Sequence, residues 1–260
     1  MSLKIFNSIK SFNATKPTIV TIGTFDGVHL GHQKIVAQIT KNAHALNCES
    51  LVLTFFPHPR MVLQESTEMK QLNTLNEKIA LLDNLGIDNL VVHPFDKEFS
   101  RLTAEEFVKK VLVDVFKIKK IIIGHDHRFG RNRTATIDDL INFGETYGFE
   151  VEQISAEEIN EVSISSTKIR NALLEGNIEL AANYLGYDYS LSGIIFKGKQ
   201  LGRTIGYPTA NITIEEDYKL IPNNGVYIAK SVLNGKTVFG MMNIGTRPTV
   251  DGTKQTIEIN

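Results

Sequence analysis

The stretch Thr21-Ile-Gly-Thr-Phe-Asp-Gly-Val-His-Leu-Gly-His32 decides the fold, because it joins an apolar, β-branched run at 18–22 to a segment with helical apolar spacing at 30–46. Its glycines let the backbone turn sharply and approach a ligand closely. A strand-to-helix turn also directs free N–H groups and the positive end of a helix dipole toward that ligand, which suits a phosphate. The imidazoles of His29 and His32 add hydrogen-bond donors for a phosphoryl transition state.

Short apolar runs alternate with amphipathic segments through the following part of the chain. The pattern predicts strands at 50–56, 89–93, 120–124 and 149–153, and helices at 75–85, 104–116 and 137–147. This alternation is typical of a parallel sheet covered by helices on both faces. Ligands of such sheets bind beyond the carboxyl ends of the strands. We therefore expect the turn at 23–32 and the loops 55–60 and 124–130 to line one crevice.

A helical stretch at 166–185 ends at Gly186, and the sequence pattern then changes. The segments 189–196, 225–233 and 237–244 alternate in hydropathy, and Asn234-Gly235 is a hairpin turn. We expect an α/β, Rossmann-like domain at 1–186 and a small antiparallel, β-barrel-like domain at 187–260.

The composition indicates a cytoplasmic enzyme. A net charge of −1 provides no basic field for nucleic acid, and the single Cys48 excludes an internal disulfide. The N-terminal residues lack the apolar stretch of a signal peptide, and no run approaches the length of a membrane span. We expect small-molecule substrates, no membrane or nucleic-acid partner, and a monomer or weak oligomer.

Seven short motifs follow one another along the chain. The chain resembles the bacterial bifunctional riboflavin kinase/FMN adenylyltransferase (FAD synthetase) family from about residue 15 to the C-terminus, on the motifs Gly23-Thr-Phe-Asp-Gly-Val-His-Leu-Gly-His32, Thr54-Phe-Phe-Pro-His-Pro59, Gly124-His-Asp-His-Arg-Phe-Gly130, Ile164-Ser-Ser-Thr-Lys-Ile-Arg170, Gly202-Arg-Thr-Ile-Gly-Tyr-Pro-Thr-Ala-Asn211, Gly225-Val-Tyr227 and Asn243-Ile-Gly-Thr-Arg-Pro-Thr249. The resemblance implies an HxGH nucleotidylyltransferase domain that transfers AMP from ATP to FMN, releasing pyrophosphate and forming FAD. It also implies a second domain that phosphorylates riboflavin to FMN, with ATP and Mg²⁺.

The resemblance also implies roles for particular residues of the first domain. His29 and His32 would stabilise charge on the ATP phosphates, and Arg170 would clamp a phosphate. Further phosphate contacts would come from Gly23, Phe25, Asp26, Gly31, Ser165, Ser166 and Thr167. The Ser-Ser-Thr run is also explained by simple N-capping of a helix, which uses the same geometry.

The loops 55–60 and 124–130 would lie on the flavin side of this site. The residues concerned are His58, His125, Asp126, Arg128 and Phe129, and the family more often has an aromatic residue where this chain has His127. Two histidines beside an aspartate also resemble a metal site, but a closed site needs further ligands. His58, between two prolines, is equally well explained as a rigid turn residue.

In the second domain, Thr209 and Asn211 would hold Mg²⁺ and ATP phosphates, and Glu258 would be the catalytic base. The sequence stops two residues after Glu258, whereas the family continues with further strands and a helix. We therefore expect an incomplete kinase domain and weak riboflavin kinase activity. Two alternatives remain: a related cytidylyltransferase, or a non-catalytic flavin- or nucleotide-binding protein.

Overall fold

The computed structural model describes residues 2–63, 69–124, 128–155, 164–197, 209–249 and 252–260. The chain forms two compact units. The first contains Met1–Met69 and Leu75–Ser166, and the second contains Lys70–Thr74 and Thr167–Asn260. Each unit is described separately below.

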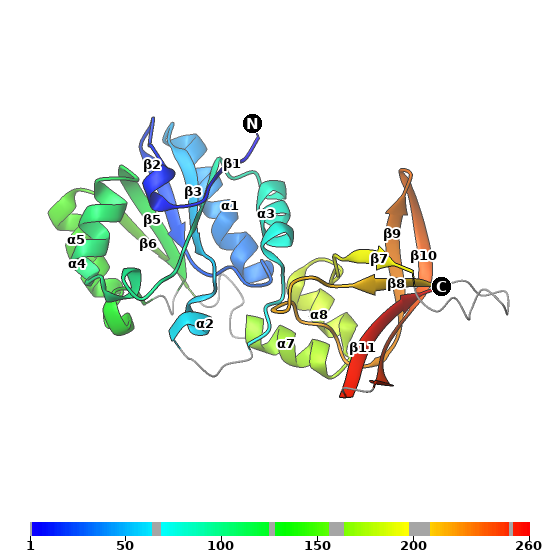
Figure 1. The fold of residues 1–260 in the computed structure, drawn as a ribbon. Helices are drawn as coiled ribbons and strands as arrows, with labels where there is room; N and C mark the ends of the chain where they lie inside the picture. Colours follow the sequence, from blue (N-terminus) through cyan, green and yellow to red (C-terminus); the bar gives the residue numbers. More distant parts are fainter. Residues whose placement is uncertain (1, 64–68, 125–127, 156–163, 198–208, 250–251) are drawn as a thin grey trace. The chain divides into compact units, whose positions relative to one another are not determined.

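The first unit is built on a parallel sheet of six strands in the order β1-β4-β3-β2-β5-β6 (Figure 1). The strands are β1 (Lys4–Phe6), β2 (Thr18–Ile22), β3 (Glu49–Phe55), β4 (Asn89–His93), β5 (Ile118–Gly124) and β6 (Glu150–Ile154). The order along the sheet reverses between β2 and β5, which is the topological switch point where such sheets bind ligands. The turn at 23–32 follows β2, so it starts at this position.

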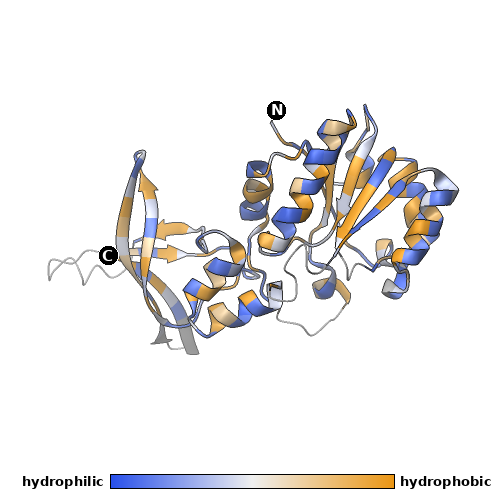
Figure 2. Cartoon of the chain, turned by 180° about the vertical axis from the view of Figure 1, so that it is seen from behind, coloured by the Kyte–Doolittle hydropathy of each residue, from blue (hydrophilic) through white to orange (hydrophobic). Residues whose placement is uncertain are grey.

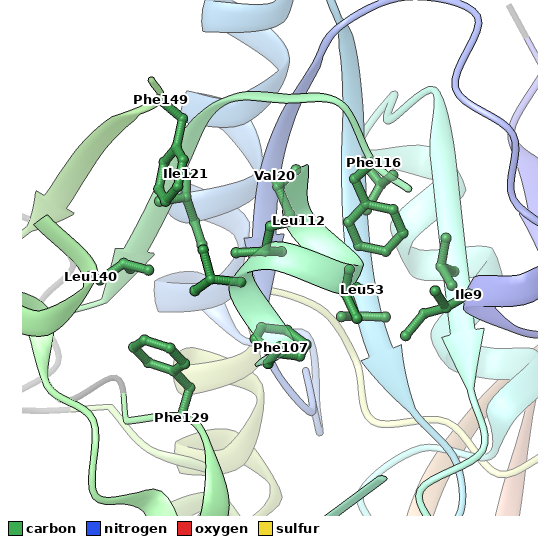
Figure 3. Close-up of a cluster of buried hydrophobic side chains, with 14 of the residues drawn as sticks. Ile9, Val20, Leu53, Phe107, Leu112, Phe116, Ile121, Phe129, Leu140 and Phe149 are labelled. Carbon is green, nitrogen blue, oxygen red and sulfur yellow. The ribbon is translucent and has the colours of Figure 1, made fainter. Parts of the chain in front are cut away.

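Helices cover both faces of the sheet, as the sequence predicts. One buried cluster joins α1 (Leu30–Ala45) and α3 (Leu75–Asn84) to one face. A second cluster joins α4 (Ala104–Phe107), the π-helical segment Val108–Val113 and α5 (Ile137–Tyr147) to the other face (Figure 3). Alternate strand residues enter the two clusters, Ile19 in the first and Val20 in the second. The strands of this sheet are mostly hydrophobic with some hydrophilic segments, while the helices show mixed hydropathy (Figure 2).

The other helical segments among the described residues of this unit are short: Ile9–Ser11, α2 (Pro59–Leu63), Phe99–Arg101 and Arg131–Arg133. The helix expected at 104–116 begins where the capping signal places it. Thr103 Oγ1 accepts the Glu106 N–H, and the Glu106 carboxylate accepts the Thr103 N–H, both at 3.1 Å. The helix then widens to π-type hydrogen bonding at Val108.

The helical stretch expected at 166–185 is two helices, α7 (Ser166–Leu174) and α8 (Ile178–Leu185). The break lies at Gly176, whose φ of +79° is a left-handed conformation that favours glycine. Asn177 then caps α8, because its side-chain oxygen accepts the Leu180 N–H at 3.0 Å. The apolar spacing of the two helices continues across this break, which explains why the sequence pattern suggests one segment.

The second unit carries an antiparallel sheet of five strands in the order β7-β8-β11-β10-β9. The strands are β7 (Ile194–Phe196), β8 (Ala210–Thr213), β9 (Gly225–Leu233), β10 (Lys236–Thr249) and β11 (Gly252–Ile259). Asn234 and Gly235 join β9 to β10 with φ of +50° and +74°, which confirms the expected hairpin turn.

The two faces of this sheet differ in their surroundings. On one face Ile244 and Ile257 are buried. On the other, Ile228 pairs directly with Met241, and both side chains are largely exposed. Asn211, Glu258 and Asn243 lie on this same exposed face, because Asn243 is two residues from Met241 on β10 and the three residues are directly paired.

Candidate active sites

The turn after β2 has a fixed and partly strained backbone. The Gly23 N–H donates to the Leu53 carbonyl at 3.1 Å, which continues the β2–β3 pairing. Phe25 and Val28 then adopt positive φ values of 48° and 35°, which non-glycine residues rarely do. Both side chains are buried, and this packing holds the unfavourable conformations in place. Backbone strain of this kind is typical of functional sites.

The two histidines lie together at the start of α1. His29 is the N-cap residue, and its Nδ1 accepts the His32 N–H at 3.4 Å. The imidazole rings are stacked, with centroids 3.7 Å apart and planes 17° apart. The Phe25 ring lies against His32 at 5.0 Å between centroids. The expected turn therefore brings both imidazoles to one point at a helix N-terminus.

Both imidazoles are neutral at neutral pH. Burial lowers the pKa of His29 to about 4, although the nearby Asp26 carboxylate acts in the opposite direction. Burial holds the pKa of His32 well below its ordinary value, and protonated His29 and the Lys78 charge act in the same direction. Since Nδ1 of His29 is an acceptor, a neutral His29 carries its proton on Nε2. Nδ1 of His32 is buried and has no hydrogen-bond partner among the described residues.

The Ser-Ser-Thr run meets the turn through one side chain. Ser166, the first residue of α7, donates its hydroxyl to the Asp26 carbonyl at 2.9 Å. Thr167 and Arg170 belong to the second unit, where Arg170 Nη1 donates to Thr167 Oγ1 at 3.5 Å. The structure thus brings Ser166 to the turn, and the phosphate contacts of Ser165, Thr167 and Arg170 remain predictions.

The two loops expected on the flavin side have internal contacts of their own. Nδ1 of His58 accepts the Arg60 N–H at 3.1 Å and so starts α2, which supports the turn role. Phe129 is only 8% exposed and packs beside Phe107 and Leu140 in the core (Figure 3). Arg128 is exposed. His125, Asp126 and His127 lie outside the described residues.

In the second unit two of the candidate kinase residues, Asn211 and Glu258, occupy one row of the sheet. Glu258 on β11 lies directly opposite Asn211 on β8, and on its other side directly opposite Asn243 on β10. Directly opposed residues of antiparallel strands share a face, so this row presents a carboxylate between two amides. Thr209 lies directly before β8, two residues ahead of Asn211. Carboxylate, amide and hydroxyl oxygens are ligands that suit Mg²⁺.

The sequence motifs do not include Lys78, which the structure places at the turn. Its side chain lies on α3 and its Nζ donates to the Thr24 carbonyl at 2.8 Å. A signal for it exists in the sequence: position 78 falls between Leu75 and Leu82 on the apolar stripe of the predicted helix, where a lysine is unusual.

The chain thus combines a histidine pair at the switch point of a parallel sheet with a separate antiparallel unit. Comparison with known families assigns this arrangement to a bifunctional transferase. The family model described as FAD synthetase matches residues 11–168, and the one described as riboflavin kinase matches residues 185–260. The bifunctional riboflavin kinase/FMN adenylyltransferase of Buchnera aphidicola from Schizaphis graminum is 40% identical over 96% of this chain and 79% of its own length. The protein of the same description from Escherichia coli K12 is 36% identical, over 93% of this chain and 77% of its own length. The chain belongs to the bifunctional riboflavin kinase/FMN adenylyltransferase family.

A solved structure shares the fold. A crystal structure described as a macrolide-efflux protein from Streptococcus pneumoniae is 29% identical, with a TM-score of 0.89 over 100% of this chain and 84% of that chain. In the described part of the present chain, no helix combines the length and apolar character needed to cross a membrane.

Proposed function

We propose that the turn at 23–32 is the place where this chain transfers AMP from ATP to FMN. The observation that carries this proposal is the pair of stacked, neutral imidazoles of His29 and His32 at the N-terminus of α1. Neutral imidazoles donate from a ring N–H, and the helix N-terminus adds free backbone N–H groups and a positive dipole. This combination is suited to a polyphosphate.

The reaction needs positioning and charge stabilisation more than covalent chemistry. A phosphate oxygen of FMN attacks the α-phosphorus of ATP, and the bond from that phosphorus to the oxygen bridging to the β-phosphate breaks. The bridging oxygen leaves with pyrophosphate, and AMP becomes joined to FMN as FAD. The two histidines donate hydrogen bonds to oxygens whose charge grows in the transition state. Neither forms a covalent bond to the substrate.

The proposed phosphate contacts extend from the turn into α7. The backbone at Gly23, Phe25, Asp26 and Gly31 lines the turn, and Ser165, Ser166, Thr167 and Arg170 supply hydroxyls and a guanidinium. The hydrogen bond from Ser166 to the Asp26 carbonyl supports this arrangement for Ser166. For the flavin side, the proposed residues are His58, His125, Asp126, Arg128 and Phe129.

Substitution of the histidines tests the site. We expect His29→Ala and His32→Ala to lower the rate of FAD formation from FMN and ATP by about 10²–10³-fold each, the usual effect of losing one such donor. His44→Ala is the matched control, because His44 lies on the same helix, in its last turn, and is exposed. Circular dichroism establishes that each variant is folded. Full activity in both histidine variants would contradict the proposal.

For the second unit we propose that Glu258 accepts the proton of the ribityl hydroxyl as riboflavin is phosphorylated, with Thr209 and Asn211 holding Mg²⁺ and the ATP phosphates. The Asn211–Glu258 pairing supports this assignment. Bound Mg²⁺ would neutralise charge on the transferred phosphoryl group. The match to riboflavin kinase and the names of the relatives favour this activity, and they lend no support to the expected weakness.

Each activity is assigned to one proposed domain: FAD synthesis to residues 1–186 and riboflavin phosphorylation to residues 187–260. The first compact unit ends at Ser166, whereas the proposed domain ends at Gly186. The compact units therefore place nearly all of α7 and the whole of α8 with the second unit. ATP, FMN and riboflavin are the proposed small-molecule partners. The cytoplasmic location and the monomeric or weakly oligomeric state stay predictions.

A further inference from the structure

We propose that Lys78 is a positioning residue that prepares the turn at 23–32 to receive the triphosphate of ATP. The proposal deepens the function proposed above and rests on it for the identity of the ligand. Lys78 is 1% exposed, and it comes from α3, an element that none of the sequence motifs covers. A lysine so deeply buried is rare unless its charge is paired or hydrogen-bonded.

The first contact of Lys78 fixes the backbone of the turn. The Thr24 carbonyl accepts hydrogen bonds from Lys78 Nζ at 2.8 Å and from Thr54 Oγ1 at 3.2 Å. In a trans peptide the carbonyl and the following N–H point in opposite directions. Holding the Thr24 oxygen toward Lys78 therefore turns the Phe25 N–H away from it. That N–H makes no hydrogen bond within the part of the chain that the structure describes, so it is available to an anion.

The second effect of Lys78 concerns charge. The Asp26 side chain is buried in the same turn. Burial lowers the pKa of Lys78, and the negative charge of Asp26 acts in the opposite direction on both Lys78 and His29. An unbalanced carboxylate at this place would repel a triphosphate. The Lys78 ammonium offsets part of the Asp26 charge, which lowers the repulsion that a triphosphate meets at this turn.

A purely structural role predicts something different. Losing a buried, hydrogen-bonded lysine destabilises a fold, so loss of activity alone would not separate the two roles. Binding of ATP to the folded protein does separate them. A structural role predicts normal affinity in every variant that folds, and a positioning role predicts a specific loss for the nucleotide.

The experiment measures binding of ATP with Mg²⁺ by titration calorimetry, without FMN. Lys78→Gln keeps a hydrogen-bond donor and removes the charge, and we expect its Kd for ATP to rise about tenfold or more. Adding Asp26→Asn removes the charge that Lys78 offsets, so the double variant should recover to within about threefold of the wild type. In steady state, KM for ATP should rise while KM for FMN stays unchanged. The control is Lys120→Met, which removes a largely buried lysine paired with Glu152 on another part of the sheet.

The outcomes are distinct. Wild-type affinity in folded Lys78→Gln would overturn the proposal, and so would a double variant that binds as weakly as the single one. Urea titrations establish which variants are folded, and Lys78→Met takes the place of Lys78→Gln in the same comparison if the glutamine variant does not fold. If the wild type binds ATP but forms no FAD, the proposed function fails while the role of Lys78 in ATP binding stands.

Discussion

The imidazole of His29 lies flat against that of His32, at 3.7 Å between centroids, and the two side chains come from opposite sides of a helix boundary. His29 is the N-cap of α1 and His32 is already helical, so the helix itself sets their separation. The hydrogen bond from the His32 N–H to His29 Nδ1 orients the imidazole ring of His29. As a result, both rings are held before any ligand arrives, and pre-organised donors of this kind contribute most to catalysis.

The burial of His29 makes the stability of the fold depend on pH. Its pKa is about 4 in the folded chain, below the ordinary value of 6.5, so the unfolded chain binds the proton more readily between these values. The stabilisation from neutral His29 is complete above about pH 6.5 and is lost as the pH falls toward 4, on the order of 3 kcal/mol in all. Urea unfolding at pH 7.5 and 4.5 measures this difference. His29→Gln should show a smaller difference, and an equal one would contradict the explanation.

Glu258 is expected to serve one activity only. Glu258→Gln should lower FMN formation from riboflavin and ATP by about 10²–10⁴-fold, since a general base is lost. FAD formation from FMN should stay close to the wild-type rate, because that reaction is assigned to the other unit. Glu215→Gln, at an exposed position after β8, is the matched control. Unchanged riboflavin phosphorylation in Glu258→Gln would remove Glu258 from the proposed site.

The fragment 1–186 is expected to form FAD from FMN and ATP. It contains both histidines, Lys78 and the Ser166 contact to Asp26. Since α7 and α8 group with the second unit, their buried residues Leu173 and Leu185 lose neighbours in this fragment, and a lower Tm than that of the whole chain is expected. Chromatographic detection of FAD and a thermal melt check both statements. A folded fragment without activity would show that the first reaction needs residues beyond 186.

Local patterns in the sequence predicted the first unit well because its strands are short apolar runs between amphipathic helices. The sequence pattern does not predict strand β1, because it has only three residues and Ile5 is exposed. Its pairing with β4 is a backbone interaction. The break at Gly176 was missed for a related reason. The apolar spacing continues on both sides of it, and only the backbone conformation shows the interruption.

The candidate sites show the same division. The motif at 23–32 predicts the histidine pair, because a strand-to-helix turn brings nearby residues together. The pairing of Asn211 with Glu258 depends on the register between strands far apart in the chain, which no local pattern specifies. The sequence did not predict a site role for Lys78, because a lysine in an amphipathic helix normally marks the solvent face. Its burial becomes intelligible only with the Thr24 carbonyl and Asp26 in view.

The most direct test of the central claim is product formation by the purified 260-residue chain from FMN, ATP and Mg²⁺, with CTP replacing ATP in a parallel reaction. FAD and pyrophosphate are quantified together, and His32→Ala is run beside the wild type. We predict equal amounts of FAD and pyrophosphate from ATP, little product from CTP, and a large loss of rate in His32→Ala. A preference for CTP would favour the cytidylyltransferase alternative, and binding of FMN and ATP without any FAD would contradict the account.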